Sequence, residues 1–242
     1  MRRILSILIL LLSFGAKAAI TMTASANTVF STATVSTSAI SPSSPSLVVV
    51  GLTYRQSQGA HIADNRGNTW TQCTKYEGSG NQSGVVFYYC VNPTIGAGLT
   101  ICNTDGGGTS NFGGISVFAF SGTVTSSPLD QQNGKFTASV SASETPGSIT
   151  PTGNGYVVLT TCMNYNGSAP TIPSGYSGFN WTTATAFAGG CGYKIQTTAA
   201  AENPSWGNMN TGGNAALNVI SFKVYTAPAA ATNGAFFFRM LD

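Results

Sequence analysis

The chain has 242 residues, of which 42% are hydrophobic and only 7% are charged, with ten Lys and Arg against seven Asp and Glu. A disordered chain has the opposite balance, with few apolar residues and a high net charge, so we expect a folded protein with a sizeable core. The length suits one large β domain or two small ones.

The first 18 residues have the three regions of a secretory signal peptide. Arg2 and Arg3 precede an apolar run over residues 4–14, and Ala16-Lys17-Ala18 fits the small-residue rule for cleavage. We therefore predict cleavage after Ala18 or Ala19 and a secreted, extracellular or cell-surface protein, with the periplasm as another destination. An uncleaved anchor is the alternative, but the apolar run has 11 residues, whereas a membrane-spanning helix needs roughly 20.

Cleavage changes the charge balance of the protein. Losing Arg2, Arg3 and Lys17 reduces the ten basic residues to seven, which equals the seven acidic ones and leaves a net charge of zero. Because binding to phosphate backbones needs an excess of Lys and Arg, we expect no nucleic-acid partner. We also expect no membrane span after cleavage, since no other stretch is long and apolar enough.

The remaining chain alternates between short apolar runs and clusters of Gly, Asn, Ser and Pro. This pattern predicts an all-β protein, an antiparallel β-sandwich of jelly-roll-like type over residues 19–225, followed by an Ala/Pro linker and an apolar tail over 226–242. Turn signals lie at 64–67, 105–108 and 133–134, and only 197–202 suits a short helical turn. The predicted strands cover residues 47–54, 68–76, 85–92, 99–103, 115–121, 135–141, 156–163, 180–187, 193–198 and 215–224.

The two halves of the chain resemble each other in sequence. The run LVVVG at 47–51 corresponds to YVVLT at 156–160, and ISVFAF at 115–120 corresponds to LNVISF at 217–222. Two further matches, 68–71 with 180–182 and 86–89 with 192–195, keep the same order. The pattern predicts either one sandwich whose halves contribute equivalent strands or two tandem sandwiches, unless it is the chance similarity of any two β segments.

The motifs LVVVGLTY, DNRGNTWTQ, VVFYYCVNPTIGAG, ISVFAFSG with the following SPLDQ, and NVISFK resemble jelly-roll-type β-sandwich modules. Such modules occur in bacterial secreted and surface proteins and in phage tail proteins. The resemblance covers residues 20–225 and implies a structural or binding module. Its motifs are strand cores and turns, so it implies no activity.

The five cysteines all lie in the predicted mature domain, where an oxidising compartment favours disulfides. We expect a Cys162–Cys191 pair between strands of the second half. In the first half, Cys73–Cys90 and Cys90–Cys102 are alternative pairs that the sequence does not separate. The odd cysteine is then either buried or available for a link between molecules.

Enzymatic chemistry finds little support in the sequence. His61 is the only histidine, no Gly-x-Ser-x-Gly elbow is present, and most acidic residues lie in predicted turns or loops. We therefore expect neither a catalytic residue, nor a metal, nor a cofactor. The alternative is an enzyme that acts on polysaccharides, because a catalytic carboxylate pair could form from distant residues.

Two aromatic and amide-rich stretches have the composition of a sugar-binding surface. They are residues 174–181 and 203–208, and they combine rings that can stack on sugars with neutral hydrogen-bonding side chains. Trp181 is also a candidate for the sandwich core, like Trp70, whereas the polar loop around Trp206 predicts an exposed ring. The candidate ligand-binding residues are Tyr176, Asn180, Trp181, Trp206 and Asn208.

Both ends of the mature chain suggest association. Residues 20–40 could form an ordinary first strand or a strand donated to a neighbouring subunit, and the run Phe236-Phe237-Phe238 should be covered by the chain's own sandwich or by a partner. We expect an exported, non-catalytic surface module with a structural, adhesive or binding role, with self-assembly as one form of it. The alternatives are a carbohydrate-binding module, a polysaccharide-acting enzyme and a phage or virion surface component.

Overall fold

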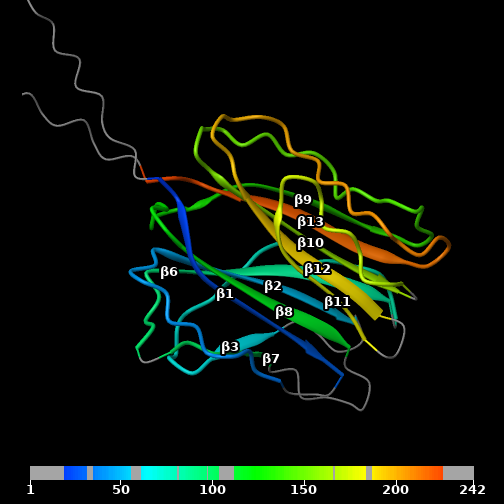
Figure 1. Cartoon of the computed structure of the whole chain (residues 1–242), viewed down its shortest axis with the longest axis horizontal. Coiled ribbons are helices and arrows are strands. Elements are labelled where there is room, and N and C mark those ends of the chain that lie inside the picture. Colours follow the sequence, from blue (N-terminus) through cyan, green and yellow to red (C-terminus); the bar gives the residue numbers. More distant parts are fainter. Residues whose placement is uncertain are drawn as a thin grey trace, which may run out of the picture.

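The computed structural model describes residues 19–31, 35–55, 61–80, 82–96, 98–103, 112–165, 167–183 and 187–225. The predicted signal peptide (1–18), the apolar tail (226–242) and the predicted turn at 105–108 lie outside the described residues. Within the described part, the chain is all-β with antiparallel strands and no helix, and two sheets pack face to face (Figure 1). The predicted all-β sandwich is confirmed.

Sheet 1 comes from the first half of the chain. Its strands are β1 (Thr21–Phe30), β2 (Leu47–Arg55), β4 (Thr71–Gln72), β6 (Ser83–Val91) and β8 (Gly113–Ser121), in the order β1-β8-β2-β6-β4, and β5 (Tyr76–Glu77) also pairs with β6. A small separate sheet pairs β3 (Ile62–Asp64) with β7 (Ile101–Asn103).

Sheet 2 comes from the second half. Its strands are β9 (Leu129–Thr137), β10 (Val157–Tyr165), β11 (Ser177–Thr182), β12 (Phe187–Ile195) and β13 (Ala215–Phe222), in the order β11-β12-β10-β13-β9. Each sheet is thus built from one continuous half of the chain.

The sequence similarity between the halves corresponds to an equivalence of strands. If β1, β8, β2, β6 and β4 are matched to β9, β13, β10, β12 and β11, the two sheets have the same strand order. The pairing differs by one residue from the sequence match, since Leu47 pairs with Phe120 in sheet 1, whereas Val157, and not Tyr156, pairs with Phe222 in sheet 2. The protein is therefore one sandwich of two similar halves, and not two tandem sandwiches.

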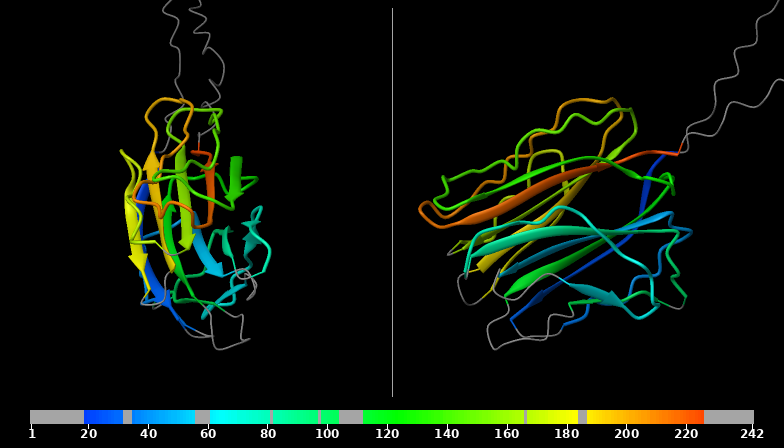
Figure 2. Two further views of the ribbon diagram at one scale, coloured as in Figure 1. Left: turned by 90° about the vertical axis from the view of Figure 1, so that its right-hand side faces the viewer. Right: turned by 180° about the vertical axis from the view of Figure 1, so that it is seen from behind.

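Each sheet is buried on both faces. Phe87, Phe118 and Phe120 of sheet 1 meet Leu159 and Phe222 of sheet 2 between the layers. Loops cover the outer side of each sheet, above and below the two layers (Figure 2). This double burial explains why β2 and the start of β10 do not alternate between apolar and polar residues, because neither strand has a solvated face.

Several predicted boundaries are wrong, and glycines are the main reason. Residues 133–134 lie inside β9 instead of forming a turn. A Cβ on Gly134 would lie 2.5 Å from the ring of Tyr76, so this glycine permits a close approach within the strand. The Gly-rich stretch 189–192 lies in β12 for the same reason, since Trp181 packs over Gly189 and Trp206 packs over Gly190.

Two other local predictions are corrected. The predicted strand 68–76 is reduced to the two-residue strands β4 and β5. The predicted helical turn at 197–202 is absent, because Glu202 instead forms a backbone bridge with Ile149 and leads the loop across the outer face of sheet 2.

The predicted disulfides are absent, since all five cysteines are free thiols. Cys191 lies opposite Thr161 in the β10–β12 pair, so the neighbouring Cys162 points to the other face of sheet 2. Accordingly, Cys191 packs between the sheets while Cys162 packs against Trp206 on the outer side. A disulfide cannot join two side chains on opposite faces without moving the backbone.

The pairs predicted for the first half are also absent. Cys73 packs in the core between the sheets, whereas Cys90 lies opposite Val48, whose side chain belongs to the outer cluster. The alternative pair is not formed either, although Cys90 and Cys102 are on the same side of sheet 1. The Cys90 Sγ lies 3.5 Å from the carbonyl oxygen of Val91, and the Cys102 Sγ lies 3.5 Å from that of Ala63.

Candidate functional site

The structure brings together the two stretches that the sequence predicts as a sugar-binding surface. Thr171, which precedes the first stretch, forms a backbone bridge with Gly207 of the second, with N–H···O distances of 2.9 and 3.3 Å. The second stretch lies on the side of sheet 2 that faces away from sheet 1, where Trp206 packs with Ile172, whereas the first stretch runs from there into β11, the edge strand of the sheet. Their meeting makes this surface the first place to test the predicted site residues.

Trp206 is fully buried, so the prediction of an exposed ring is wrong. Its indole lies over Gly190, where a Cβ would come within 2.7 Å of the ring. The indole N–H donates a hydrogen bond to Thr160 Oγ1 at 3.0 Å, and its backbone pairs with Glu144. Trp206 therefore fills the space under the loops and presents no face to a sugar.

Trp181 is buried in the core, with 6% of its surface exposed. It lies between the sheets, close to Gly114 of sheet 1 and Gly189 of sheet 2. Its packing matches the interpretation of Trp181 as a core residue. Neither tryptophan of the predicted surface is thus available for stacking.

Asn180 and Asn208 are exposed, but both amides anchor the same loop. Asn180 Nδ2 donates to the Pro170 carbonyl at 3.0 Å, and Asn208 Nδ2 donates to the Ala169 carbonyl at 2.9 Å. Two asparagines that are 28 residues apart in the sequence thereby hold the neighbouring carbonyls of residues 169 and 170. The side-chain amides that were predicted to bind a ligand instead donate hydrogen bonds to the backbone of this loop.

Tyr176, the last predicted residue, belongs to a polar cluster around Glu202. Its hydroxyl donates to Glu202 Oε2 at 3.0 Å, while Lys194 Nζ and Gln196 Nε2 donate to Oε1 at 2.6 and 2.7 Å. The Lys194 ammonium also lies 5.8 Å from the centre of the Tyr176 ring. The cluster ties the loop after β12 back to the strand itself.

The ionisation of this cluster suits a structural role. Burial is the largest effect on Glu202 and raises its pKa, but the hydrogen bonds from Lys194, Gln196 and Tyr176 together with the Lys194 charge lower the pKa below its usual value. Burial and the neighbouring carboxylate raise the pKa of Tyr176. At neutral pH the carboxylate stays charged and the phenol stays protonated, so neither group is prepared to exchange a proton.

Other carboxylates are used in the same way. Glu144 accepts from Lys135 Nζ at 2.7 Å and from the Ser141 backbone at 3.0 Å. Asp64 accepts from the Arg66 backbone and from Trp70 Nε1, both at 2.6 Å. These contacts fit the prediction that acidic residues support turns and loops.

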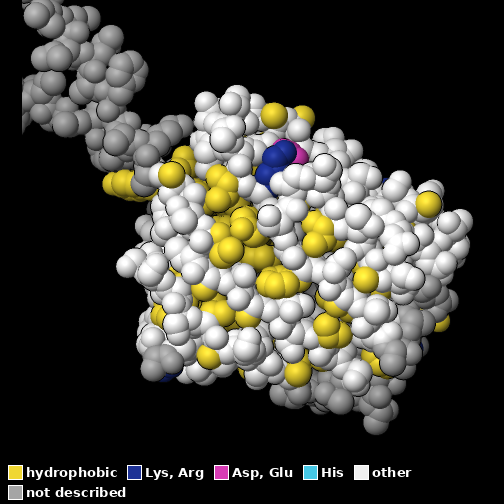
Figure 3. All heavy atoms as spheres, in the orientation of Figure 1, with side chains coloured by type: hydrophobic (Ala, Val, Ile, Leu, Met, Phe, Trp, Pro, Cys, Tyr) yellow, Lys and Arg dark blue, Asp and Glu magenta, His cyan; other side chains and the backbone are white. Residues whose placement is uncertain are grey.

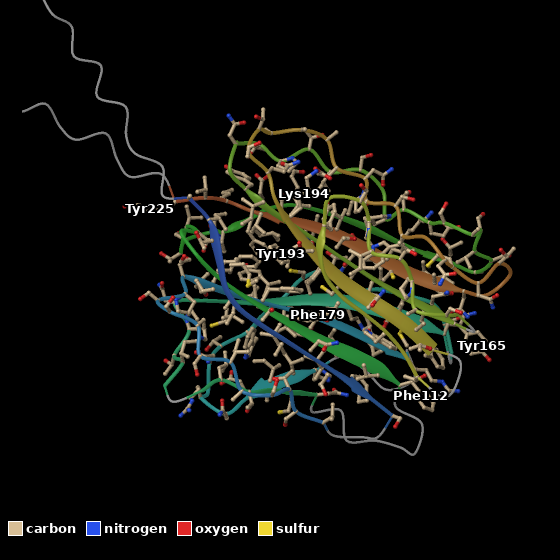
Figure 4. The ribbon with its side chains drawn as sticks, viewed as in Figure 1. Phe112, Tyr165, Phe179, Tyr193, Lys194 and Tyr225 are labelled. Carbon is tan, nitrogen blue, oxygen red and sulfur yellow. The ribbon has the colours of Figure 1, made fainter. Side chains whose placement is uncertain are left out.

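A different surface, which we call the edge patch, lies where β1 and β11 border the same side of the sandwich. It consists of Met22, Phe179, Tyr193 and Ile195, all partly buried against the core between the sheets. Figure 3 shows apolar side chains gathered on this face with few charges around them, and Figure 4 shows Tyr193 and Phe179 along it.

Unequal strand lengths leave the edge patch uncovered. The six residues of β11 pair with 188–193 of β12, so among the described residues no strand pairs with 194–195 on that side. The rings beneath belong to the core, since Phe118 lies 5.7 Å from Phe179 and 5.4 Å from Tyr193 between centroids. The patch is thus an opening in the side of the core, framed by two edge strands.

Sequence reasoning missed the edge patch. Phe179 and Tyr193 fall in or beside predicted strands, and nothing in the sequence says that these strands are neighbours at an open side. Among the described residues, no three or more His, Cys, Asp or Glu side chains lie close enough together to hold a metal ion.

The same part of the chain contains no helix long and apolar enough to cross a membrane. Comparison of the chain with models of protein families, with curated protein sequences and with solved structures finds no match to any of them.

Proposed function

We propose that the protein is an exported, non-catalytic β-sandwich that serves as a structural or adhesive module at the cell surface and associates with further copies of itself. The observation that carries this proposal is the edge patch, an apolar opening between two edge strands. Edge strands present unpaired backbone groups and are natural sites of strand addition. The signal sequence supports the exported location.

The alternatives receive less support from the described residues. The burial of Trp206 and the engagement of Asn180 and Asn208 take away the side chains expected to bind a glycan. Glu202, Glu144 and Asp64 are each occupied by internal donors, which disfavours a catalytic carboxylate pair.

Imaging of the secreted protein tests the proposal. We expect negative-stain micrographs and light scattering of the mature chain, residues 19–242, to show assemblies of many copies. Release of reducing sugar from a panel of polysaccharides should remain at background. A strictly monomeric protein across the micromolar range, or a clear hydrolytic activity, would contradict the proposed function.

A further inference from the structure

The described chain stops beside the edge patch. The Tyr225 backbone N–H donates to the Gly122 carbonyl at 2.7 Å, directly after the end of β8, and Val224 packs in the same core cluster as Tyr193 and Phe179. Tyr225 is itself one of the most exposed large apolar residues, at 45%. Figure 4 shows Tyr225, Tyr193 and Phe179 following one another across this face.

The sequence continues for 17 residues beyond Tyr225. Residues 226–234 (TAPAAATNG) form a small-residue spacer, and 235–242 read AFFFRMLD. In an extended strand, Phe236, Phe238 and Met240 would share one face, whereas Arg239 would point to the other. As an extended strand, this segment would therefore have an apolar face that could cover the edge patch.

The pairing direction favours a segment that is supplied by a second copy. Every strand pair of the sandwich is antiparallel, and β1 begins at the end of the molecule where the tail leaves, because Thr21 pairs with Ser121 beside Gly122. A tail that simply continues from Tyr225 along its own β1 would therefore run parallel to it.

To run antiparallel in the same molecule, the seven residues 235–241 would first have to be carried past seven residues of β1, a distance of about 24 Å. The nine-residue spacer covers at most about 32 Å when fully extended, so it would have to run almost straight and still make the return turn within the remaining length of about 8 Å. A tail that arrives from a neighbouring molecule has no such restriction.

Resting on the proposed self-association, we propose that residues 235–241 of one copy add as an antiparallel strand to the free edge of β1 in a second copy and cover its edge patch with Phe236, Phe238 and Met240. Backbone hydrogen bonds along β1 provide the register, and the inward side chains fill the opening over Phe179 and Tyr193. Each copy then carries one donor and one acceptor, so the contact is head-to-tail and extends into chains or rings.

Donor and acceptor can be removed separately. We expect the 19–225 protein and the Met22→Lys variant each to be monomeric by light scattering, with circular dichroism confirming the β-sheet. Mixed together, they should form 1:1 heterodimers, because the first keeps the patch and the second keeps the tail. Leu129→Lys is the matched control: it is also partly buried on an edge strand, and it pairs with Phe222 as Met22 pairs with Phe120. It should assemble like the unaltered chain.

Variants in the tail test the alternation without touching the sandwich. The double variant Phe236→Ser/Phe238→Ser should weaken assembly at least 100-fold, whereas Phe237→Ser should change it less than 10-fold. Assembly of the 19–225 protein equal to that of the full mature chain would overturn the inference while leaving self-association intact. A monomeric full chain whose 19–225 form binds a synthetic 235–242 peptide would show that the tail covers its own molecule, and would overturn it too. Absence of assembly by the full chain without such peptide binding would refute the proposed function as well.

Discussion

Replacing Trp206 by Ala tests whether this residue is a structural support or a ligand platform. The side chain is fully buried beneath the loops over sheet 2, where it fills the space above Gly190. Truncating a buried Trp to Ala costs about 3–5 kcal/mol through lost transfer energy and the cavity left behind. For a protein of this size, that corresponds to a fall of roughly 6–20 °C in Tm.

Trp206→Phe separates packing from hydrogen bonding. It keeps most of the apolar volume but removes the indole N–H that donates to Thr160 Oγ1. Thr160 itself donates to the Asn218 carbonyl at 2.9 Å, so its hydroxyl is not left without a partner. We therefore expect a smaller cost, about 1–2 kcal/mol.

Urea unfolding followed by tryptophan fluorescence and circular dichroism measures both costs. The exposed Tyr225 provides the control, because Tyr225→Ala should change the free energy of unfolding by no more than about 0.5 kcal/mol. A Trp206→Ala variant that loses less than 1 kcal/mol would refute the structural role. Loss of glycan binding at unchanged stability would restore the sugar-binding hypothesis.

Three further changes test other parts of the structure. The pKa of Glu202 is lowered in the folded protein, so its carboxylate stabilises the fold above about pH 4.5, and this contribution is lost as the pH falls through the folded pKa. Glu202→Gln should therefore make the fall of Tm between pH 5 and 3 less steep. A Tm profile equal to that of the unaltered protein would count against the stabilising role of this cluster. Gly51→Ala would place a Cβ 2.7 Å from Cys191 Sγ and should lower the free energy of unfolding by about 1–3 kcal/mol. The double variant Gly51→Ala/Cys191→Ala should lose less stability than the sum of the two single changes, because removing the sulfur relieves the clash. Strictly additive losses would contradict this contact. Cys162 and Cys191 point to opposite faces and burial raises the pKa of both, so each should take up an alkylating reagent only after unfolding without reductant; a disulfide-linked peptide pair in the mass spectrum would refute the assignment.

The fold class could be predicted from the sequence because its signals are local. The apolar runs of β2, β6, β8, β10 and β13 coincide with predicted strands to within a few residues. The match between the two halves also predicted equivalent strands. These features depend on period and composition, which each segment carries by itself.

The candidate site could not be predicted, because it depends on which residues from distant parts of the chain pack against each side chain. Gly189 and Gly190 fall between two predicted strands, yet they make room within β12 for two indole rings on opposite faces. Trp206 stands in a polar loop, yet that loop folds back and buries it. The edge patch arises because β11 is shorter than β12, a difference visible only once the strands are placed side by side.

The division of the sandwich has a consequence for how the chain acquires its structure. Each sheet comes from one half, and the apolar face between the layers is completed only by the other half. Neither half alone can shield its inner face, so we regard the two as obligate partners joined by the short connection at residues 122–128. The two halves pack like the two subunits of a dimer that are joined in one polypeptide. The inner face of the first half can therefore be shielded from water only after the second half has been synthesised.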